Sequence, residues 1–161
     1  MPIQAGETIP SMKLTQSTPD GPKETSTEEL FGGKTVVLFG VPGAFTPTCS
    51  IRHLPGFVEQ ADALKAKGAD AVACLAVNDA FVLAAWAKDQ GVGDKIVMLA
   101  DGGAEFTKTL GLEMDLSARG LGVRSQRFAL VAKDKKVAHI AVEAPGAFEV
   151  SRAEAVLEAL R

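Results

Sequence analysis

The chain has 161 residues, of which 47% are hydrophobic and 23% charged, and its net charge at pH 7 is −3. A chain of this length buries enough surface to form a core without disulfides or metal, so we expect a single domain spanning residues 1–161. The apolar content excludes disorder, and two cysteines are too few for a disulfide scaffold. No basic stripe or basic amphipathic face is present, so binding to nucleic acid or to a membrane is not expected.

The N-terminal sequence MPIQAGETIPSMKL lacks the basic and apolar regions of a secretory signal. No apolar stretch approaches the roughly 20 residues that span a bilayer. Two cysteines without an export signal are typical of a reducing compartment. We therefore expect a cytoplasmic protein whose thiols are reduced.

The first half of the chain alternates extended runs with helical patterns. Pro19-Asp20-Gly21-Pro22 is a turn signal between two short extended segments and predicts a hairpin. The further elements expected here are a capped helical turn at 26–31, a buried strand at 34–41, a helix from about 48 to 67 with a kink or fresh start at Pro55, and a second buried strand at 71–77.

The second half continues the alternation and ends in a hairpin and a helix. The expected elements are a helix capped by Asn78 or Asp79 that reaches Gln90, a strand at 95–100, a short helix at 104–110, two strands at 126–133 and 136–142, and a final helix at 151–161 with Ser151 and Glu154 as a capping box. This order predicts an α/β protein with a thioredoxin-like fold, in which helices flank a central mixed sheet.

Cys49 lies at a position in the predicted fold that is typical of a reactive cysteine. The buried strand at 34–41 ends in a Pro/Gly loop, and Cys49 falls in the first turn of the helix that follows. Ligands of open α/β sheets bind beyond the carboxyl ends of strands, and a helix N-terminus stabilises a thiolate. Thr46 can offer a hydroxyl to the sulfur or to a bound ligand. Position alone also fits an inert cysteine, because free Cys is among the most buried residue types.

The motif Pro-x-x-x-Thr-x-x-Cys, formed by Pro42, Thr46 and Cys49, resembles the active-site signature of the peroxiredoxins. The longer string PGAFTPTCSIRHLPGFVEQ at 42–60 is similar to the type II (atypical, subfamily five) branch. The resemblance continues in KGADAVACLAVND around Cys74, in LADGGAEFTKTLGL at 99–112 and in RSQRFALV at 124–131. It therefore covers essentially the whole chain.

The resemblance implies a thiol peroxidase that reduces hydrogen peroxide and alkyl hydroperoxides without cofactor or metal. Cys49 would attack the peroxide and become a sulfenic acid. Thr46 would donate a hydrogen bond to the peroxide as negative charge develops on its oxygens, and Pro42 would shield the sulfur from water. The family also uses an arginine from a distant strand to bind the peroxide and favour the thiolate. Arg127 matches it best, and Arg124 is the alternative.

The resemblance also bears on turnover and assembly. Some members of this branch carry a resolving cysteine before the C-terminal helix, and Ser151 fills that position here. This implies a one-Cys cycle, in which glutathione with glutaredoxin, or thioredoxin, reduces the oxidised Cys49. Cys74 lies in the middle of an apolar run and is expected to be buried and inert. Members often dimerise across the region of Phe45, so a homodimer is expected.

The other conspicuous side chains receive structural interpretations. His53 is expected to pack or to form hydrogen bonds, and Trp86 to lie in the core. The set Cys49, Cys74, His53 and His139 lacks the ligand spacing of known zinc sites, so no metal site is predicted.

Two other functions remain open at this point. A thiol-disulfide oxidoreductase of the same fold would need a Cys-x-x-Cys motif, but Thr46 occupies the first cysteine position. A redox sensor or relay module would use Cys49 without sustained turnover. Such a module has no chemical need for Pro42, Thr46, Cys49 and Arg127 together.

Overall fold

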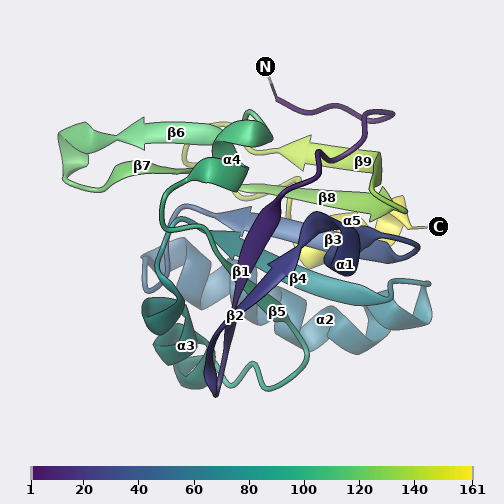
Figure 1. The fold of residues 1–161 in the computed structure, drawn as a ribbon, viewed down its shortest axis with the longest axis horizontal. Coiled ribbons are helices and arrows are strands. Elements are labelled where there is room, and N and C mark those ends of the chain that lie inside the picture. Colours follow the sequence, from purple (N-terminus) through teal and green to yellow (C-terminus); the bar gives the residue numbers. More distant parts are fainter. Residues whose placement is uncertain (1, 161) are drawn as a thin grey trace.

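The computed structural model describes residues 2–160, and within them seven strands form one mixed sheet (Figure 1). The spatial order is β2-β1-β5-β4-β3-β8-β9. The central strand β3 pairs in parallel with β4 and antiparallel with β8. The strand bounds are β1 Lys13–Thr18, β2 Gly21–Ser26, β3 Thr35–Val41, β4 Ala71–Ala76, β5 Val97–Ala100, β8 Phe128–Lys133 and β9 Lys136–Val142. The predicted thioredoxin-like α/β fold, with the apolar run at 34–41 as a central strand, is confirmed.

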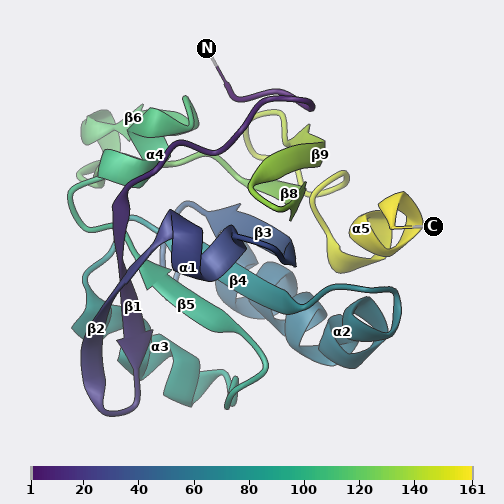
Figure 2. The same ribbon diagram turned by 45° about the vertical axis from the view of Figure 1, so that its right-hand side comes forward.

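Helices cover both faces of this sheet (Figures 1 and 2). One face packs against α2, α3 and α5, and the other against the short helices α1 and α4. The helix bounds are α1 Thr27–Phe31, α2 Leu54–Ala66, α3 Ala80–Asp89, α4 Glu105–Thr109 and α5 Ala153–Ala159. Among the described residues, none of these helices is long and apolar enough to cross a membrane.

Alternate residues of β3 divide between two apolar cores, as the two-residue period of a strand requires. Val37 and Phe39 lie in the core under α2 and α3, together with Trp86. Val36 and Leu38 lie in the core on the opposite face. The strand is therefore buried on both sides, which is why its sequence is a continuous apolar run.

A second, two-stranded sheet was not anticipated from the sequence. β6 (Glu113–Leu116) pairs antiparallel with β7 (Gly122–Ser125), and a 3-10 turn at Ser117–Arg119 lies between them. In Figure 1 this hairpin extends from the upper left of the molecule. Its strands are short and mostly half-exposed, so the sequence contains no continuous apolar run that would predict them. The hairpin matters for function because β7 carries Arg124.

The predicted capping box at Ser151 and Glu154 is wrong. Helix α5 begins at Ala153, two residues later than expected, and has no side-chain cap. The hydroxyl of Ser151 donates instead to the buried carboxylate of Glu143, at 2.7 Å. A buried carboxylate without donors costs more free energy than an exposed helix end without a cap. The Ser151 hydroxyl therefore binds Glu143 rather than capping α5. Arg161, the predicted last residue of this helix, lies outside the described residues.

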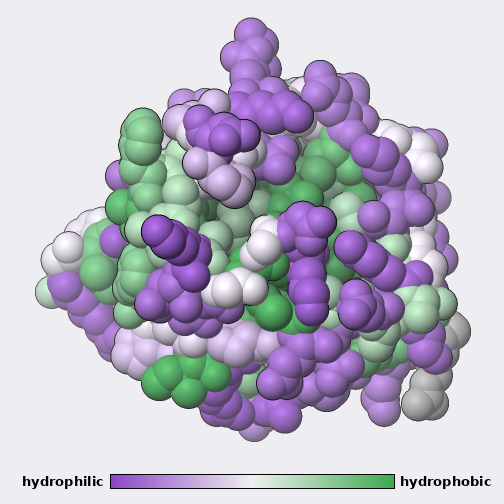
Figure 3. Space-filling model, turned by 90° about the horizontal axis from the view of Figure 1, so that it is seen from below, coloured by the Kyte–Doolittle hydropathy of each residue, from purple (hydrophilic) through white to green (hydrophobic). Residues whose placement is uncertain are grey.

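Three large apolar side chains are exposed near the carboxyl ends of β3 and β4. Phe45 is 53% exposed, Ile51 73% and Phe81 72%. Phe45 and Ile51 follow β3 in the chain, and Phe81 follows β4, the parallel neighbour of β3. Figure 3, which views the molecule from below, shows apolar side chains reaching the surface among polar ones.

Candidate active site

Cys49 lies in a wide helical turn between β3 and α2. Residues Cys49–His53 form a π-helical turn, which is closed by a hydrogen bond from the Leu54 N–H to the carbonyl of Cys49. Pro55, in the first turn of α2, has no N–H, and in a regular α-helix its ring would clash with the carbonyl four residues earlier. An extra residue in the preceding turn relieves this conflict. The sequence predicted a kink or a fresh helix start at Pro55; the structure has a π-helical turn directly before Pro55, in a helix that continues without a break.

Arg127, directly before β8, contacts the sulfur of Cys49. Its Nη2 donates to Cys49 Sγ at 3.2 Å, and its Nη1 lies 3.0 Å from His53 Nδ1. Cys49 and His53 have no exposed surface. A guanidinium is permanently charged and can stabilise negative charge that develops on a sulfur it contacts. The contact therefore places a fixed positive charge beside the sulfur of Cys49, at the carboxyl end of the central strand.

His53 connects Arg127 to the loop before α5. With Nδ1 accepting from Arg127, the ring proton is assigned to Nε2, which donates to the carbonyl of Ser151 at 3.0 Å. Burial and the positive charge of Arg127 lower the pKa of His53 to about 3. The ring is therefore neutral at physiological pH. The hydrogen-bonding role expected for His53 is confirmed.

Glu143 completes this chain of contacts, and the sequence analysis missed it. Its Oε2 accepts from the N–H and the hydroxyl of Ser151, at 2.8 and 2.7 Å, and from the N–H of Glu149, at 2.8 Å. Burial acts to raise the pKa of this carboxyl, but the hydrogen bonds outweigh it, so the pKa is lowered. The carboxylate thereby holds Ser151 against His53. An acidic residue after a strand is usually at the surface, so the sequence contained no signal for it.

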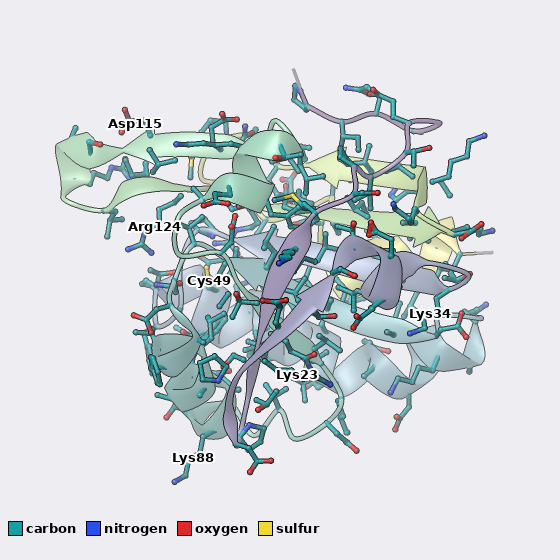
Figure 4. All side chains as sticks on the ribbon, viewed as in Figure 1. Lys23, Lys34, Cys49, Lys88, Asp115 and Arg124 are labelled. Carbon is teal, nitrogen blue, oxygen red and sulfur yellow. The ribbon has the colours of Figure 1, made fainter. Side chains whose placement is uncertain are left out.

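The loop after β3 is held by one hydrogen bond within the loop and by two from residues far away in the sequence. The Thr46 hydroxyl donates to the Gly43 carbonyl at 2.7 Å. The Ala44 N–H donates to the side chain of Asn78 at 2.9 Å. Arg124 Nη1 donates to the carbonyl of Pro42 at 3.2 Å. Figure 4 shows Arg124 and Cys49 at the same end of the molecule. The structure thus places Pro42 and Thr46 in the loop that leads to Cys49.

The two arginines differ in what they bind. Arg127 donates to the sulfur, whereas Arg124 donates to loop carbonyls, those of Pro42 and Leu121. Asn78 and Asp79, which the sequence offered as alternative caps of one helix, form different hydrogen bonds. Asp79 caps α3 by accepting from the Val82 N–H, and Asn78 holds the loop.

Cys74 lies in β4 and belongs to the same apolar core as Cys49. Burial and, secondarily, the nearby Cys49 raise the pKa of the Cys74 thiol well above its ordinary value. A thiol that stays protonated is a poor nucleophile. Both cysteines are free. Cys74 is thus buried, as expected, and suited to packing rather than to reaction with peroxide.

Trp86 is buried in the core as predicted, and its indole N–H also donates to the hydroxyl of Ser50 at 2.9 Å. This bond anchors the π-helical turn next to Cys49. Within residues 2–160, no three His, Cys, Asp or Glu side chains gather in a way that could hold a metal ion.

Gly43→Ala is expected to displace Arg124, because a methyl group there would overlap Arg124 Nη1 and crowd Thr46. Loss of the bond to the Pro42 carbonyl should lower the free energy of unfolding by about 1 kcal/mol. Urea unfolding of Gly43→Ala, Arg124→Ala and the double variant checks this in a double-mutant cycle. Both changes remove the same bond, so the double variant should lose less than the sum. Fully additive losses would contradict the coupling.

Stability should fall as the pH drops from 6.5 towards 3, because His53 stays neutral in the folded protein while the unfolded chain binds a proton near pH 6.5. This group contributes at most about 1.4 kcal/mol per pH unit. Urea unfolding between pH 7 and 4.5 measures the slope. His53→Gln should flatten it, and the matched variant at the other histidine, His139→Gln, should keep the wild-type slope. Equal slopes in all three proteins would show that His53 is not responsible.

The Redoxin family profile matches residues 4–157, so the chain belongs to the Redoxin family. Peroxiredoxin-2C of Oryza sativa subsp. japonica is 50% identical over 160 residues, which cover 99% of both proteins.

Two solved structures that resemble this chain are also peroxiredoxins by name. Reduced Prx3 of Vibrio vulnificus in complex with H2O2 is 53% identical, with a TM-score of 0.93 and 99% of both chains covered. Peroxiredoxin 5 of Alvinella pompejana is 35% identical, with a TM-score of 0.87 and coverage of 99% of this chain and 98% of that one. Within the Redoxin family the chain is therefore a peroxiredoxin, a thiol-dependent peroxidase.

Proposed function

We propose that the protein reduces hydrogen peroxide and alkyl hydroperoxides by oxidation of Cys49 to a sulfenic acid. The observation that carries this proposal is the contact of the partly buried Arg127 with the fully buried Cys49, in which Nη2 lies 3.2 Å from Sγ. The relative from Vibrio vulnificus was crystallised with H2O2, which supports a peroxide substrate. The likeness to a peroxiredoxin 5 supports the type II, subfamily five branch.

In the oxidation step the Cys49 thiolate attacks the terminal oxygen of the peroxide. A sulfur–oxygen bond forms, the O–O bond breaks, and the other oxygen leaves as water or an alcohol after taking up a proton. Arg127 lies beside the sulfur and donates to the oxygens as negative charge moves onto them. Thr46 was predicted to donate to the peroxide, but its hydroxyl already donates to the Gly43 carbonyl, so its oxygen lone pairs accept from the peroxide O–H instead. Pro42 limits the access of water.

In the resolution step an external thiol reduces the sulfenic acid, in a one-Cys cycle. Ser151 stands where some members of the resembling branch carry a resolving cysteine, and its hydroxyl is bound to Glu143. Cys74 is buried, and its raised pKa keeps it protonated. Glutathione with glutaredoxin is the first choice of reductant and thioredoxin the second. Because Cys49 is fully buried, the thiol reaches it only after a local movement of the π-helical turn.

We also propose a homodimer that covers the exposed apolar side chains Phe45, Ile51 and Phe81. Phe45 and Ile51 lie in the segment between β3 and α2 that also carries Cys49, and Phe81 lies in the first turn of α3, which follows β4. The backbone of Phe45 has a φ of 64°, which favours glycine. A large aromatic residue in this conformation fits a contact role better than a solvent-exposed one. A reducing cytoplasm is the proposed location, in keeping with two free thiols.

The experiment that tests this function measures peroxide consumption in the presence of excess thiol. Glutathione with glutaredoxin, and separately a thioredoxin system, should each be offered to the oxidised protein. An enzyme consumes many equivalents of peroxide per chain with at least one of these reductants. Consumption that stops after one equivalent, with every reductant, would instead show the redox sensor or relay module.

A further inference from the structure

A pocket of about 240 Å³ lies beside the π-helical turn, between α2 and the start of α5. Two arginines and one aromatic ring line it: Arg52, Arg152 and Phe148. Arg52 belongs to the same turn as Cys49, three residues further along the chain. The pocket is therefore built on the segment that carries the reactive sulfur.

Three guanidinium groups lie around the ring of Phe148. The guanidinium carbons of Arg52 and Arg152 lie 4.6 and 5.0 Å from the ring centroid, and that of Arg127 lies 6.0 Å away. The edge of the ring also meets His53, at 5.1 Å between centroids. One aromatic side chain thus connects the two pocket arginines to the arginine that contacts Cys49.

In the described part of the chain, the charges of the two pocket arginines are not paired with carboxylates, and one of their N–H donors has no hydrogen-bond partner. Among residues 2–160, neither Arg52 nor Arg152 forms an ion pair. Arg152 donates through Nη2 to the carbonyl of Phe148 at 2.9 Å, but its buried Nε has no hydrogen-bond partner. A buried donor without a partner is costly, so a small movement of the Arg152 side chain that brings Nε to an oxygen anion of a ligand would be favourable. Such a guanidinium is suited to a carboxylate, which it binds through two parallel N–H groups.

We propose that this pocket binds a carboxylate of the thiol that reduces Cys49, which makes the preferred reductant a peptide thiol of the glutathione type. The proposal rests on the proposed function, in which an external thiol resolves the sulfenic acid. Glu59 and Glu154 also line the pocket and suit the ammonium group that such a zwitterion carries. An extended tripeptide spans roughly 10 Å, so a carboxylate anchored at Arg52 leaves its thiol within reach of the same helical turn.

The bound thiol acts as follows. Its thiolate attacks the sulfenic sulfur of Cys49, an S–S bond forms, and the S–O bond breaks. The departing hydroxide takes up a proton and becomes water. A second molecule of the thiol then attacks the mixed disulfide, which returns the Cys49 thiolate and releases the disulfide of the reductant. Two thiols are thereby oxidised for each peroxide reduced.

The test uses the full chain, oxidised with one equivalent of hydrogen peroxide, and three thiols that differ in charge. These are glutathione, its uncharged diester and 2-mercaptoethanol. The rate of sulfenic acid loss is measured for wild type, Arg52→Gln, Arg152→Gln and Arg52→Lys. Arg119→Gln is the matched control, because Arg119 is exposed and lies on the β6–β7 hairpin.

The measured quantity is the rate with glutathione divided by the rate with 2-mercaptoethanol. We expect Arg52→Gln and Arg152→Gln each to lower this ratio about tenfold, and Arg52→Lys to restore part of it. Arg119→Gln should keep the wild-type ratio. The diester should react with wild type and the glutamine variants alike, since it lacks the carboxylates that the arginines bind. Because all values are ratios within one protein, a general loss of folding does not imitate the result.

Two different failures can be told apart. If peroxide oxidises Cys49 but Arg52→Gln and Arg152→Gln keep the wild-type ratio, or if glutathione does not resolve the sulfenic acid at all, the pocket proposal is overturned and the peroxidase step stands. If peroxide leaves Cys49 unoxidised in wild type, the proposed function itself falls, and the pocket proposal falls with it.

Discussion

Cys49→Ser is expected to abolish peroxide reduction, with a loss of at least about 10⁴-fold in the rate of the oxidation step. A serine hydroxyl is not ionised at neutral pH, so Arg127 has no anion to stabilise and the peroxide meets no nucleophile. The matched variant is Cys74→Ser, which removes the other thiol from the same apolar core. It should keep the wild-type rate. Stopped-flow measurement of sulfenic acid formation reports both.

Loss of peroxide reactivity in a correctly folded Cys74→Ser protein would contradict this assignment. Circular dichroism and the urea midpoint establish whether the fold is intact. Both cysteines are fully buried, so small changes of stability are expected in either variant. The comparison of oxidation rates therefore has to be made under conditions where both proteins are folded.

Arg127→Ala is expected to slow the oxidation of Cys49 by about 10²–10³-fold, the usual cost of removing one preorganised donor to developing charge. The alkylation rate of Cys49 should fall as well, because the guanidinium that donates to the sulfur is gone. Alkylation rate against pH reports this second effect separately from peroxide chemistry. His53 loses a partner in the same variant, so Arg127→Lys is included to preserve the charge near the sulfur.

Arg124→Ala is the matched control for this prediction. Arg124 contacts the backbone of the loop and not the sulfur, so its loss should leave the alkylation profile of Cys49 unchanged and should slow oxidation far less. The opposite result, with Arg124 essential and Arg127 dispensable, would mean that the wrong arginine has been placed at the sulfur.

The central part of the fold could be predicted because its signals are local. The apolar run of β3, the Pro/Gly loop and the position of Pro55 placed Cys49 in the first turn of a helix, and the structure agrees. Buried parallel strands and helix starts leave such marks in the sequence because each depends on neighbouring residues. The motif then predicted Pro42 and Thr46 as further site residues, and both lie in the loop between β3 and Cys49.

The supporting contacts could not be predicted because they join distant segments. Ser151 has the sequence context of a helix cap, but the buried Glu143 takes its hydroxyl. Phe148 has no local feature that distinguishes it from a core residue, yet it packs beside three guanidinium groups. Only the packing of the 143–152 segment against the turn at Cys49 brings these groups together.

Mass spectrometry of the protein after one equivalent of hydrogen peroxide tests the role of Cys49 most directly. Without added thiol, the mass gained should be that of one oxygen or more, on the peptide that contains Cys49. With glutathione present, the same peptide should carry one glutathione, as a one-Cys cycle requires. Cys74 should remain a free thiol in both samples. A disulfide that forms rapidly between Cys49 and Cys74 of one chain would contradict the one-Cys cycle and make Cys74 the resolving residue.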